Sequence, residues 1–213
     1  MSLSTRKAIA DIARDYQLII IEDAINSLYS PTVLPPIASL LPEQTIYISS
    51  LSKSINPALR LAFIYSPFTY YQDLDHALYN INLMASPLST AIACNLLDSS
   101  LVDTIITERQ ASIVSRNQLA DEILKGFTLL GNCYAPFRLL LLPEGWTGKN
   151  FETAAKNAGV QVYCIERFAV GNTKTIPAVR LALSAPPSLE ELTHGLSILR
   201  ELLSPHTDDF TVF

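Results

Sequence analysis

The sequence predicts an α/β protein with a larger N-terminal part and a smaller C-terminal unit. Three observations predict this: a helical segment and apolar runs of strand length alternate before residue 66, helical spacing continues from residue 67 to 131, and a shorter strand–helix alternation follows. A chain of 213 residues suits one large or two small domains. Such a chain can bury roughly 70% of its unfolded surface, so it needs no metal or disulfide for stability.

The N-terminal part is expected to contain one helix followed by three strands. Residues 4–16 carry apolar side chains at helical spacing, and residues 18–21 form an apolar run that ends in two acids. A run of this kind, buried on both faces and preceded by a helix, is typical of a parallel strand. Residues 45–49 and 60–65 are the second and third expected strands.

Residues 67–131 are expected to be helical throughout. The smaller unit then alternates again, with strands at 137–142, 160–164 and 179–183 and a helix at 150–157. A final helix begins at an S-x-x-E capping box made by Ser188 and Glu191. Its leucine stripe is too short for a zipper and is expected to face the core; it consists of Leu192, Leu196, Leu199 and Leu203.

Composition excludes several classes of function. All seven glycines lie in the C-terminal 88 residues, so the first part contains neither a Walker loop nor a GxGxxG turn, both of which need glycine. A net charge of −5 provides no basic patch, and direct nucleic-acid binding by this chain is not expected. Three widely spaced cysteines, Cys94, Cys133 and Cys164, fit free thiols in a reducing compartment and argue against zinc. We expect no metal site.

No segment of the chain reads as a membrane span or a secretory signal. The longest uncharged stretches, 24–43 (which ends at an acid) and 77–97, contain prolines or asparagines that are costly in hydrocarbon. The N-terminus leads into a charged amphipathic helix and lacks an apolar signal region. We therefore expect a cytoplasmic protein without membrane contact.

The chemistry-bearing residues lie directly after two of the expected strands. Lys53 follows the second strand, where burial lowers the pKa of an amine toward that of a Schiff-base nucleophile. Ser50, Ser52 and Arg60 supply hydroxyls and a forked cation that can hold a phosphate without glycine. Asp23 ends the first strand on the same expected rim, where its carboxylate could pair with a protonated ring nitrogen. The alternative reading is a strand-end lysine in water beside loop serines.

Taken together, these motifs resemble the pyridoxal-phosphate site of fold-type I aminotransferases. Three later segments resemble the small domain of one branch, the aminotransferase-like domain of MocR-type regulators of the GntR family: Leu142-Pro-Glu-Gly-Trp-Thr, Cys164-Ile-Glu-Arg-Phe-Ala and Val179-Arg-Leu-Ala-Leu-Ser. The resemblance covers essentially the whole chain. It implies a partial large domain of a fold-type I pyridoxal-phosphate-dependent transferase followed by its C-terminal small α/β domain.

The resemblance also implies roles for individual residues. Lys53 would form the Schiff base with pyridoxal phosphate, Asp23 would bind the ring nitrogen, and Ser50, Ser52 and Arg60 would hold the phosphate. Arg180 would bind the α-carboxylate of an amino acid, a task that suits its bidentate fork. Residues 1–100 would be the second half of the large domain, 101–130 a long connecting helix and 131–213 the small domain.

The sequence departs from the family pattern at two places in the site. Asn26 stands where the family has a tyrosine that bonds the ring hydroxyl, and alanines replace two glycines in the segment Pro57-Ala-Leu-Arg-Leu-Ala62. The family module is also about twice as long. Its first half, which carries the ring-stacking aromatic residue, is expected to lie outside this chain, and so is the winged-helix DNA-binding domain that precedes the module. We therefore expect weak or transient cofactor binding, no transamination by the fragment alone, DNA contact only through another domain, and self-association as a homodimer.

Other functions compete with this interpretation. The chain could belong to a genuine aminotransferase, or it could be a degenerate interaction module without cofactor. Ser50-Leu-Ser-Lys53 also matches the S-x-x-K motif of penicillin-binding proteins, but Lys174-Thr-Ile lacks the glycine of their third motif. Asp73, Asp75 and His76 have the residue types of a metal site without further ligands, so a solvated helix face explains them better.

Overall fold

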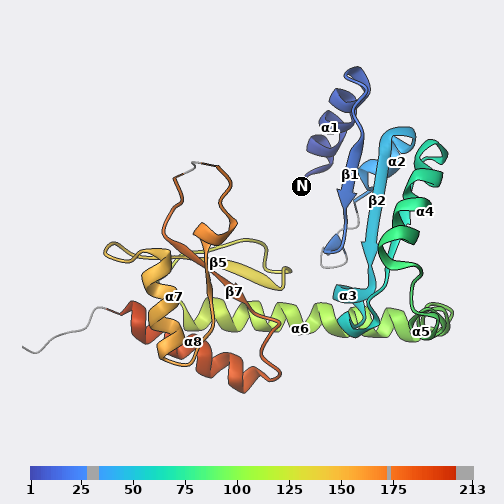
Figure 1. The fold of residues 1–213 in the computed structure, drawn as a ribbon. Helices are drawn as coiled ribbons and strands as arrows, with labels where there is room; N and C mark the ends of the chain where they lie inside the picture. The colour runs from blue at the N-terminus through green and yellow to red at the C-terminus, as the bar shows by residue number, and fades with distance from the viewer. Residues whose placement is uncertain (28–33, 172–173, 205–213) are drawn as a thin grey trace, which may run out of the picture. The chain divides into compact units, whose positions relative to one another are not determined.

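The computed structural model describes residues 1–27, 34–171 and 174–204 (Figure 1). The chain forms two compact units, Met1–Arg109 and Gln110–Phe213. Both units are mixed α/β, and the long helix α6 (Leu101–Ile123) contributes residues to each of them. None of the helices in the described part of the chain combines the length and the hydropathy that a membrane crossing requires.

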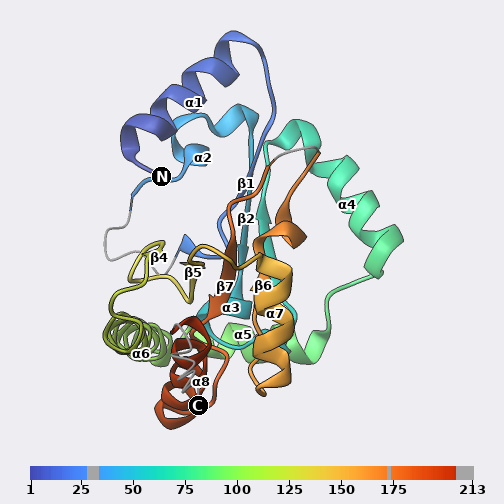
Figure 2. The same ribbon diagram turned by 90° about the vertical axis from the view of Figure 1, so that its left-hand side faces the viewer.

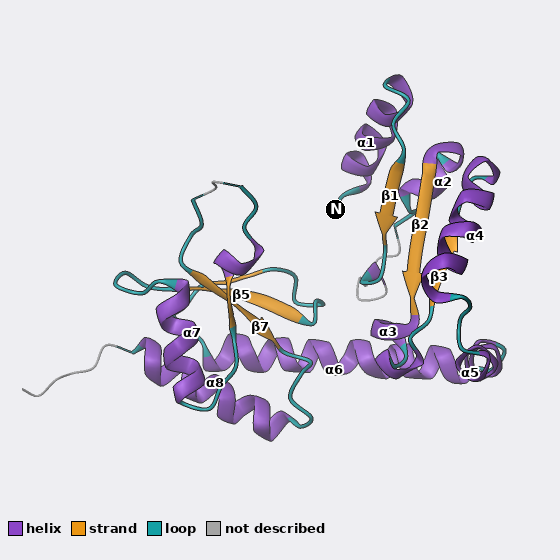
Figure 3. Ribbon diagram, in the orientation of Figure 1, coloured by secondary structure: helices purple, strands orange, loops and turns teal. Residues whose placement is uncertain are grey.

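A three-stranded sheet forms the centre of the first unit (Figure 3). Its strands are β1 (Ile20–Asp23), β2 (Thr45–Ser50) and β3 (Ala62–Tyr65), in that order. β1 and β2 run parallel, as predicted, and β3 is antiparallel to β2. Because β1 and β2 are parallel, the residues that follow them emerge at the same edge of the sheet.

The helices of the first unit lie on both sides of this sheet. α1 packs against α2, and Figure 2 shows both on one side of the sheet and α4 on the other. The Ser2 hydroxyl caps α1 by accepting from the Thr5 N–H at 3.2 Å. The helical elements are α1 (Leu3–Asp15), α2 (Ile37–Leu40), η2 (Pro42–Gln44), α3 (Leu51–Ser54), η3 (Pro57–Leu59), α4 (Phe68–Asn82) and α5 (Pro87–Leu97).

The expectation that the first strand is buried on both faces is wrong. Side chains along β1 alternate between half-buried and exposed, and Ile21 is 68% exposed. Ile20 packs against the small cluster formed by α1 and α2, so within the first unit these two helices cover one face of the strand. An apolar run therefore predicts a strand here, but it does not establish that both faces of that strand are covered.

The second unit is built on a four-stranded antiparallel sheet in the order β4-β5-β7-β6. The final helix α8 (Leu189–Leu203) begins as predicted, with the Ser188 hydroxyl accepting from the Glu191 N–H at 3.1 Å, and its leucine stripe is buried in the core. The remaining elements are β4 (Leu129–Leu130), β5 (Phe137–Leu141), α7 (Gly148–Asn157), β6 (Tyr163–Cys164), η4 (Ile165–Phe168) and β7 (Ala178–Ala182).

Strand β6 is shorter than the sequence predicts. Residues 160–162 lie outside it, and the Val160 N–H donates to the Ala155 carbonyl at 2.8 Å, which closes the end of α7. Only Tyr163 and Cys164 pair with β7, opposite Arg180 and Val179. This short pairing places Tyr163 directly beside Arg180.

Candidate functional site

Asp23 and Asn26 lie at the edge of the first sheet where β1 ends. Asp23 pairs with Ile48 of β2, and the ladder continues one residue further, where the Ala24 N–H donates to the Ile48 carbonyl at 2.8 Å. The Asp23 carboxylate is exposed and accepts from the Ile25 N–H at 3.2 Å. Asn26 is exposed in the turn that follows. This carboxylate is therefore held beside the end of β2 by backbone pairing on both sides of it.

Ser50 ends β2 and caps the short helix α3. Its hydroxyl oxygen accepts from the Ser52 N–H at 3.1 Å and lies within hydrogen-bond distance of the Leu61 carbonyl, 3.0 Å, and of the Ser52 hydroxyl, 3.1 Å. The single hydroxyl proton of Ser50 is thus directed at partners inside the loop. Ser52 is the serine of this pair whose proton can be directed at a ligand.

Lys53 lies in α3 with an exposed side chain, so the expectation that this amine is buried after the second strand is wrong. The helix is fixed to the unit by its neighbours, because Leu51 and Ile55 are buried together with Leu61. The Leu51 N–H also donates to the Leu61 carbonyl at 3.2 Å. The lysine is therefore presented on a short helix with a buried side, directly after the end of β2.

Arg60 follows the 3-10 turn η3 and adopts a left-handed conformation, with φ of 53°. The turn begins at Asn56, whose side-chain carbonyl accepts from the Ala58 N–H at 2.8 Å. The positive φ thus falls on the arginine, and neither Ala58 nor Ala62, which stand where the family has glycines, has a positive φ. A non-glycine residue in this region is strained and is often found at functional sites.

The first sheet brings the predicted residues of the first unit together. Ser50 pairs with Ala62 across β2 and β3, so Arg60 lies two residues from the partner of Ser50. A carboxylate, a hydroxyl, an ammonium and a guanidinium group therefore share one edge of the sheet. This set of groups suits a ligand with both a phosphate and a basic ring nitrogen.

Arg180 belongs to the second unit, in the middle of β7 between Leu139 of β5 and Tyr163 of β6. Its guanidinium carbon lies 5.0 Å from the ring centroid of Phe168, 5.6 Å from that of Tyr163 and 5.8 Å from that of Phe137. Its Nε is buried without a hydrogen-bond partner. In the residues that the structure describes, no carboxylate pairs with Arg180.

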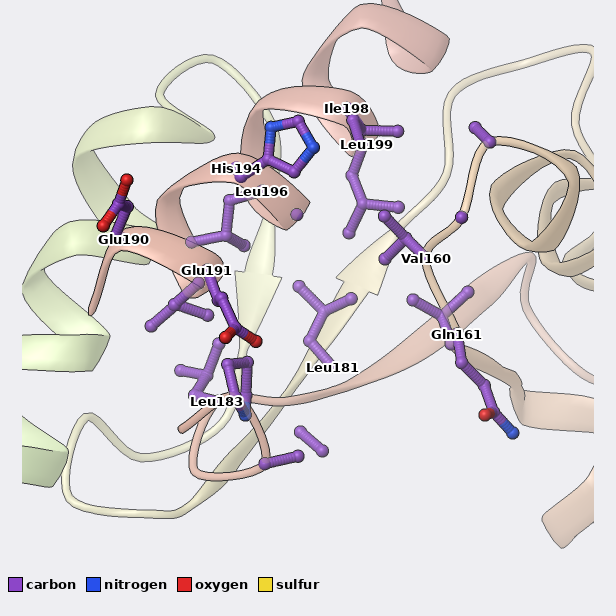
Figure 4. Close-up of a pocket in the computed structure, with 18 of the residues that line it drawn as sticks. Val160, Gln161, Leu181, Leu183, Glu190, Glu191, His194, Leu196, Ile198 and Leu199 are labelled. Carbon is purple, nitrogen blue, oxygen red and sulfur yellow. The ribbon is translucent and has the colours of Figure 1, made fainter. Parts of the chain in front are cut away.

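The neighbouring Leu181 faces the opposite side of β7, as alternation along a strand requires. Figure 4 shows Leu181 and Leu183 at a cavity of about 640 Å³ below α8, together with Val160 and Leu196. Arg180 is not among the residues that line this cavity. Its side chain thus belongs to the aromatic cluster on the other face of the sheet.

A second charged cluster adjoins Tyr163. Glu152 of α7 accepts from the Arg167 Nε at 3.0 and 3.1 Å, from the Arg167 Nη2, and from the Cys164 N–H at 2.7 Å. The bonds from Arg167 and Cys164 outweigh the effect of burial and lower the pKa of Glu152 to about 2. Burial and the adjacent Glu152 raise the pKa of the Cys164 thiol, which makes it a poor nucleophile.

This cluster should make the second unit sensitive to acid. A carboxyl whose pKa is lower in the folded state stabilises the fold above its unfolded pKa, near 4.5, and this contribution is lost as the pH falls toward 2. We expect Glu152→Gln to cost about 1 kcal/mol at pH 7, with a difference that shrinks below pH 4.5. Urea unfolding from pH 7 to 3, followed by Trp146 fluorescence, measures this.

Other charged groups near Glu152 could also contribute to the acid dependence of stability. Arg167 stays cationic throughout this pH range. Glu166 and Lys149 line the same surface pocket as Glu152 and Arg167. Glu166→Gln is therefore the matched control, and it should leave the acid dependence in place. A wild-type chain that loses no more stability than Glu152→Gln between pH 5 and 3 would contradict the assignment.

The sequence did not identify Tyr163 as a neighbour of Arg180, nor Glu152 as the partner of Arg167. Tyr163 of β6 pairs with Arg180 on the adjacent strand β7, and Glu152 bonds to Arg167 from helix α7. Only the strand register and the packing of α7 bring these residues together. The single available signal was the segment 164–169, which contains Arg167 and contributed to the family resemblance.

The sequence is similar to that of a transcriptional regulator. No family model matches the sequence. The chain is 43% identical over 211 residues to an uncharacterized HTH-type transcriptional regulator, YdeF, of Bacillus subtilis (strain 168). The match covers 99% of this chain and 45% of the regulator, so the chain spans less than half the length of this relative.

Solved structures show the fold. An archaeal alanine:glyoxylate aminotransferase superposes with a TM-score of 0.85 at 24% identity, over 95% of this chain and 52% of the enzyme. A multiple substrate aminotransferase from Thermococcus profundus gives 0.84 at 25% identity with the same coverage. Aspartate aminotransferase from Thermus thermophilus gives 0.85 at 16% identity, over 95% and 53%. The chain has the fold of about half of a fold-type I aminotransferase.

Proposed function

We propose that this chain, a relative of an HTH-type transcriptional regulator with the fold of fold-type I aminotransferases, is part of the effector domain of a MocR-type regulator of the GntR family. In this proposal the domain senses pyridoxal phosphate or its adduct with an amino acid. The observation that carries the proposal is the shared sheet edge, where Asp23, Ser52, Lys53 and Arg60 lie together. The relationship to a regulator favours sensing over turnover.

The groups at this edge fit pyridoxal phosphate by their chemistry. The cofactor supplies an aldehyde that bonds to an amine and a ring that withdraws electrons when its nitrogen is protonated. Asp23 would keep that nitrogen protonated, and Lys53 would provide the amine. Arg60 and the Ser52 hydroxyl would hold the phosphate, while Ser50 fixes the turn that presents them.

Arg180 would bind the carboxylate of the sensed amino acid. Its guanidinium has a buried, unpartnered Nε and lies among aromatic rings, with no carboxylate of the described chain in contact. A guanidinium that has no internal counter-ion is suited to a bidentate ligand carboxylate. Asn26 replaces the family tyrosine that bonds the ring hydroxyl, which is consistent with cofactor binding that is weaker than in an enzyme.

DNA binding and dimerisation would belong to the whole regulator. The chain carries a net charge of −5, so contact with DNA would come from another domain of the protein. The first unit exposes many large apolar side chains, which are suited to an interface with a second copy or with the rest of the protein: Ile21, Phe63, Tyr65, Tyr79, Ile81 and Met84. We propose a cytoplasmic homodimer.

Reductive trapping tests the role of Lys53. The full chain is incubated with pyridoxal phosphate, reduced with borohydride, digested and analysed by mass spectrometry. We expect the reduced adduct to be concentrated on Lys53, because this amine shares the sheet edge with Ser52 and Arg60, the groups proposed to hold the phosphate. Lys53→Ala should reduce total labelling to the background level of the other lysines, and the exposed Lys7→Ala should leave it unchanged.

Two outcomes would contradict the proposal. Labelling spread evenly over all lysines would mean that the sheet edge does not hold the cofactor. Conversion of amino acid to oxo acid by the cofactor-loaded chain, lost in Lys53→Ala, would favour an aminotransferase over a sensor.

A further inference from the structure

Tyr163 lies next to two cationic side chains. The guanidinium carbon of Arg180 lies 5.6 Å from the centroid of the tyrosine ring, and that of Arg167 lies over the same ring at 5.7 Å. The Gln161 side-chain amide donates to the tyrosine hydroxyl at 2.7 Å. The electron-rich ring attracts both cations, so its position influences where each of them is held.

Arg167 is in turn held by Glu152. The two residues are joined by bonds from the Arg167 Nε to both carboxylate oxygens, and the same carboxylate accepts from the backbone of Cys164, next to Tyr163. A guanidinium fixed at two points has little freedom to leave the ring beneath it. A continuous series of contacts therefore runs from α7 through η4 and β6 to β7.

The two arginines of this series differ in whether a carboxylate balances their charge. Glu152 neutralises Arg167, whereas no carboxylate of the described chain neutralises Arg180. The aromatic cluster therefore contains one compensated and one uncompensated cation. Ring faces reduce the cost of burying a guanidinium, but they satisfy none of its N–H donors. The buried Nε of Arg180 accordingly has no hydrogen-bond partner.

We propose that Glu152, Arg167 and Tyr163 are positioning residues for Arg180. Glu152 holds Arg167 over the tyrosine ring, and the ring holds the Arg180 guanidinium with its donors uncommitted, ready for the carboxylate of a ligand. This inference rests on the proposed carboxylate role of Arg180 and extends it to three residues that do not touch the ligand. Phe168 completes the aromatic surroundings of the guanidinium.

Nuclear magnetic resonance of the arginine Nε–H groups in the full chain tests the inference. Arg180→Lys assigns the Arg180 signal by its disappearance. In the wild-type chain we expect this proton to lie upfield of those of exposed arginines, because it is close to aromatic rings, and to exchange slowly, because its Nε is buried. Titration with sodium propionate, a simple carboxylate, should then shift the same signal.

Variants along the series separate positioning from general stability. In Glu152→Gln, which keeps an acceptor for the Cys164 N–H, we expect the Arg180 signal to move toward those of exposed arginines and the propionate response to weaken several-fold. Arg167→Gln should act in the same way and leave the fold in place, because that side chain is 57% exposed. Tyr163→Leu should have the largest effect, and Tyr163→Phe, which keeps the ring, should restore the wild-type signal.

Asp11→Asn is the matched control, because it breaks an exposed ion pair with Arg14 in the other unit. The possible outcomes distinguish the two proposals. No propionate response at Arg180 in the wild-type chain would refute the carboxylate role. A normal response that is unchanged in Glu152→Gln, Arg167→Gln and Tyr163→Leu would refute the positioning role alone.

Discussion

Replacing Phe151 with alanine is expected to lower the free energy of unfolding of the second unit by about 3–5 kcal/mol. Phe151 is 0% exposed, and its ring meets that of Trp146 edge-to-face with centroids 5.1 Å apart. It packs in the cluster that joins α7 to the sheet and to α8. The substitution removes a large apolar side chain from this cluster and leaves a cavity that its close-packed neighbours cannot fill.

Urea unfolding of the full chain measures this loss. Trp146 is the chain's one tryptophan and belongs to the second unit, so its fluorescence reports on that unit, and circular dichroism provides a second probe because the substitution also changes the environment of Trp146. Phe168→Ala is the matched control: this ring is 48% exposed, and its loss should cost about 1 kcal/mol or less. Equal losses for the two variants would show that Phe151 is not a central residue of this core.

The same substitution affects the candidate site only indirectly. Phe151 and Glu152 are consecutive in α7. The packing of Phe151 into the core therefore fixes the position of the helix from which Glu152 meets Arg167. A chain weakened at Phe151 should therefore lose the Glu152–Arg167 contact and the core together. This coupling is a reason to test the positioning residues with Arg167→Gln rather than with substitutions in the core.

Local patterns predicted much of this fold because they report short-range physics. The capping box at Ser188 and the leucine stripe of α8 need only neighbouring residues on one helix, and the structure confirms both. The parallel orientation of β1 was predicted from an apolar run preceded by a helix, and its parallel pairing with β2 confirms it. The burial of β1 was predicted wrongly because coverage depends on what packs against a strand.

The residues of the candidate site also differ in whether the sequence alone predicts that they lie together. Ser50, Ser52, Lys53 and Arg60 lie within eleven residues of the sequence, so a single motif contains them, and the short elements α3 and η3 gather them. Tyr163 and Arg180 meet through strand register, which cannot be read from either segment alone. The expectation that residues 67–131 are helical throughout is wrong at its end, because α6 stops at Ile123 and Leu129–Leu130 form strand β4. A two-residue strand is too short to leave a pattern in the sequence.

Arg138→Met is expected to destabilise the second unit by about 2–4 kcal/mol. The Arg138 side chain is 8% exposed and lies in the unit's interior. Its Nη1 donates to the side-chain carbonyl of the buried Asn117 at 3.1 Å, its Nη2 donates to the Leu129 carbonyl at 3.1 Å, and the same Nη2 lies 3.3 Å from Asp121. Methionine fills much of the same space but leaves these acceptors unpaired.

The cost arises mainly from Asn117, and a double-mutant cycle can isolate it. The Asn117 amide still donates to the Ile113 and Ala135 carbonyls in Arg138→Met, but its oxygen has lost its donor in a buried position. Asn117→Leu in the same background removes that oxygen, so the double variant should lose less stability than the sum of the two single variants. The exposed Lys156→Met should change the free energy of unfolding by about 0.5 kcal/mol at most. Strictly additive losses would mean that the Arg138–Asn117 bond contributes nothing, and that the arginine stabilises the unit through β4 and Asp121 instead.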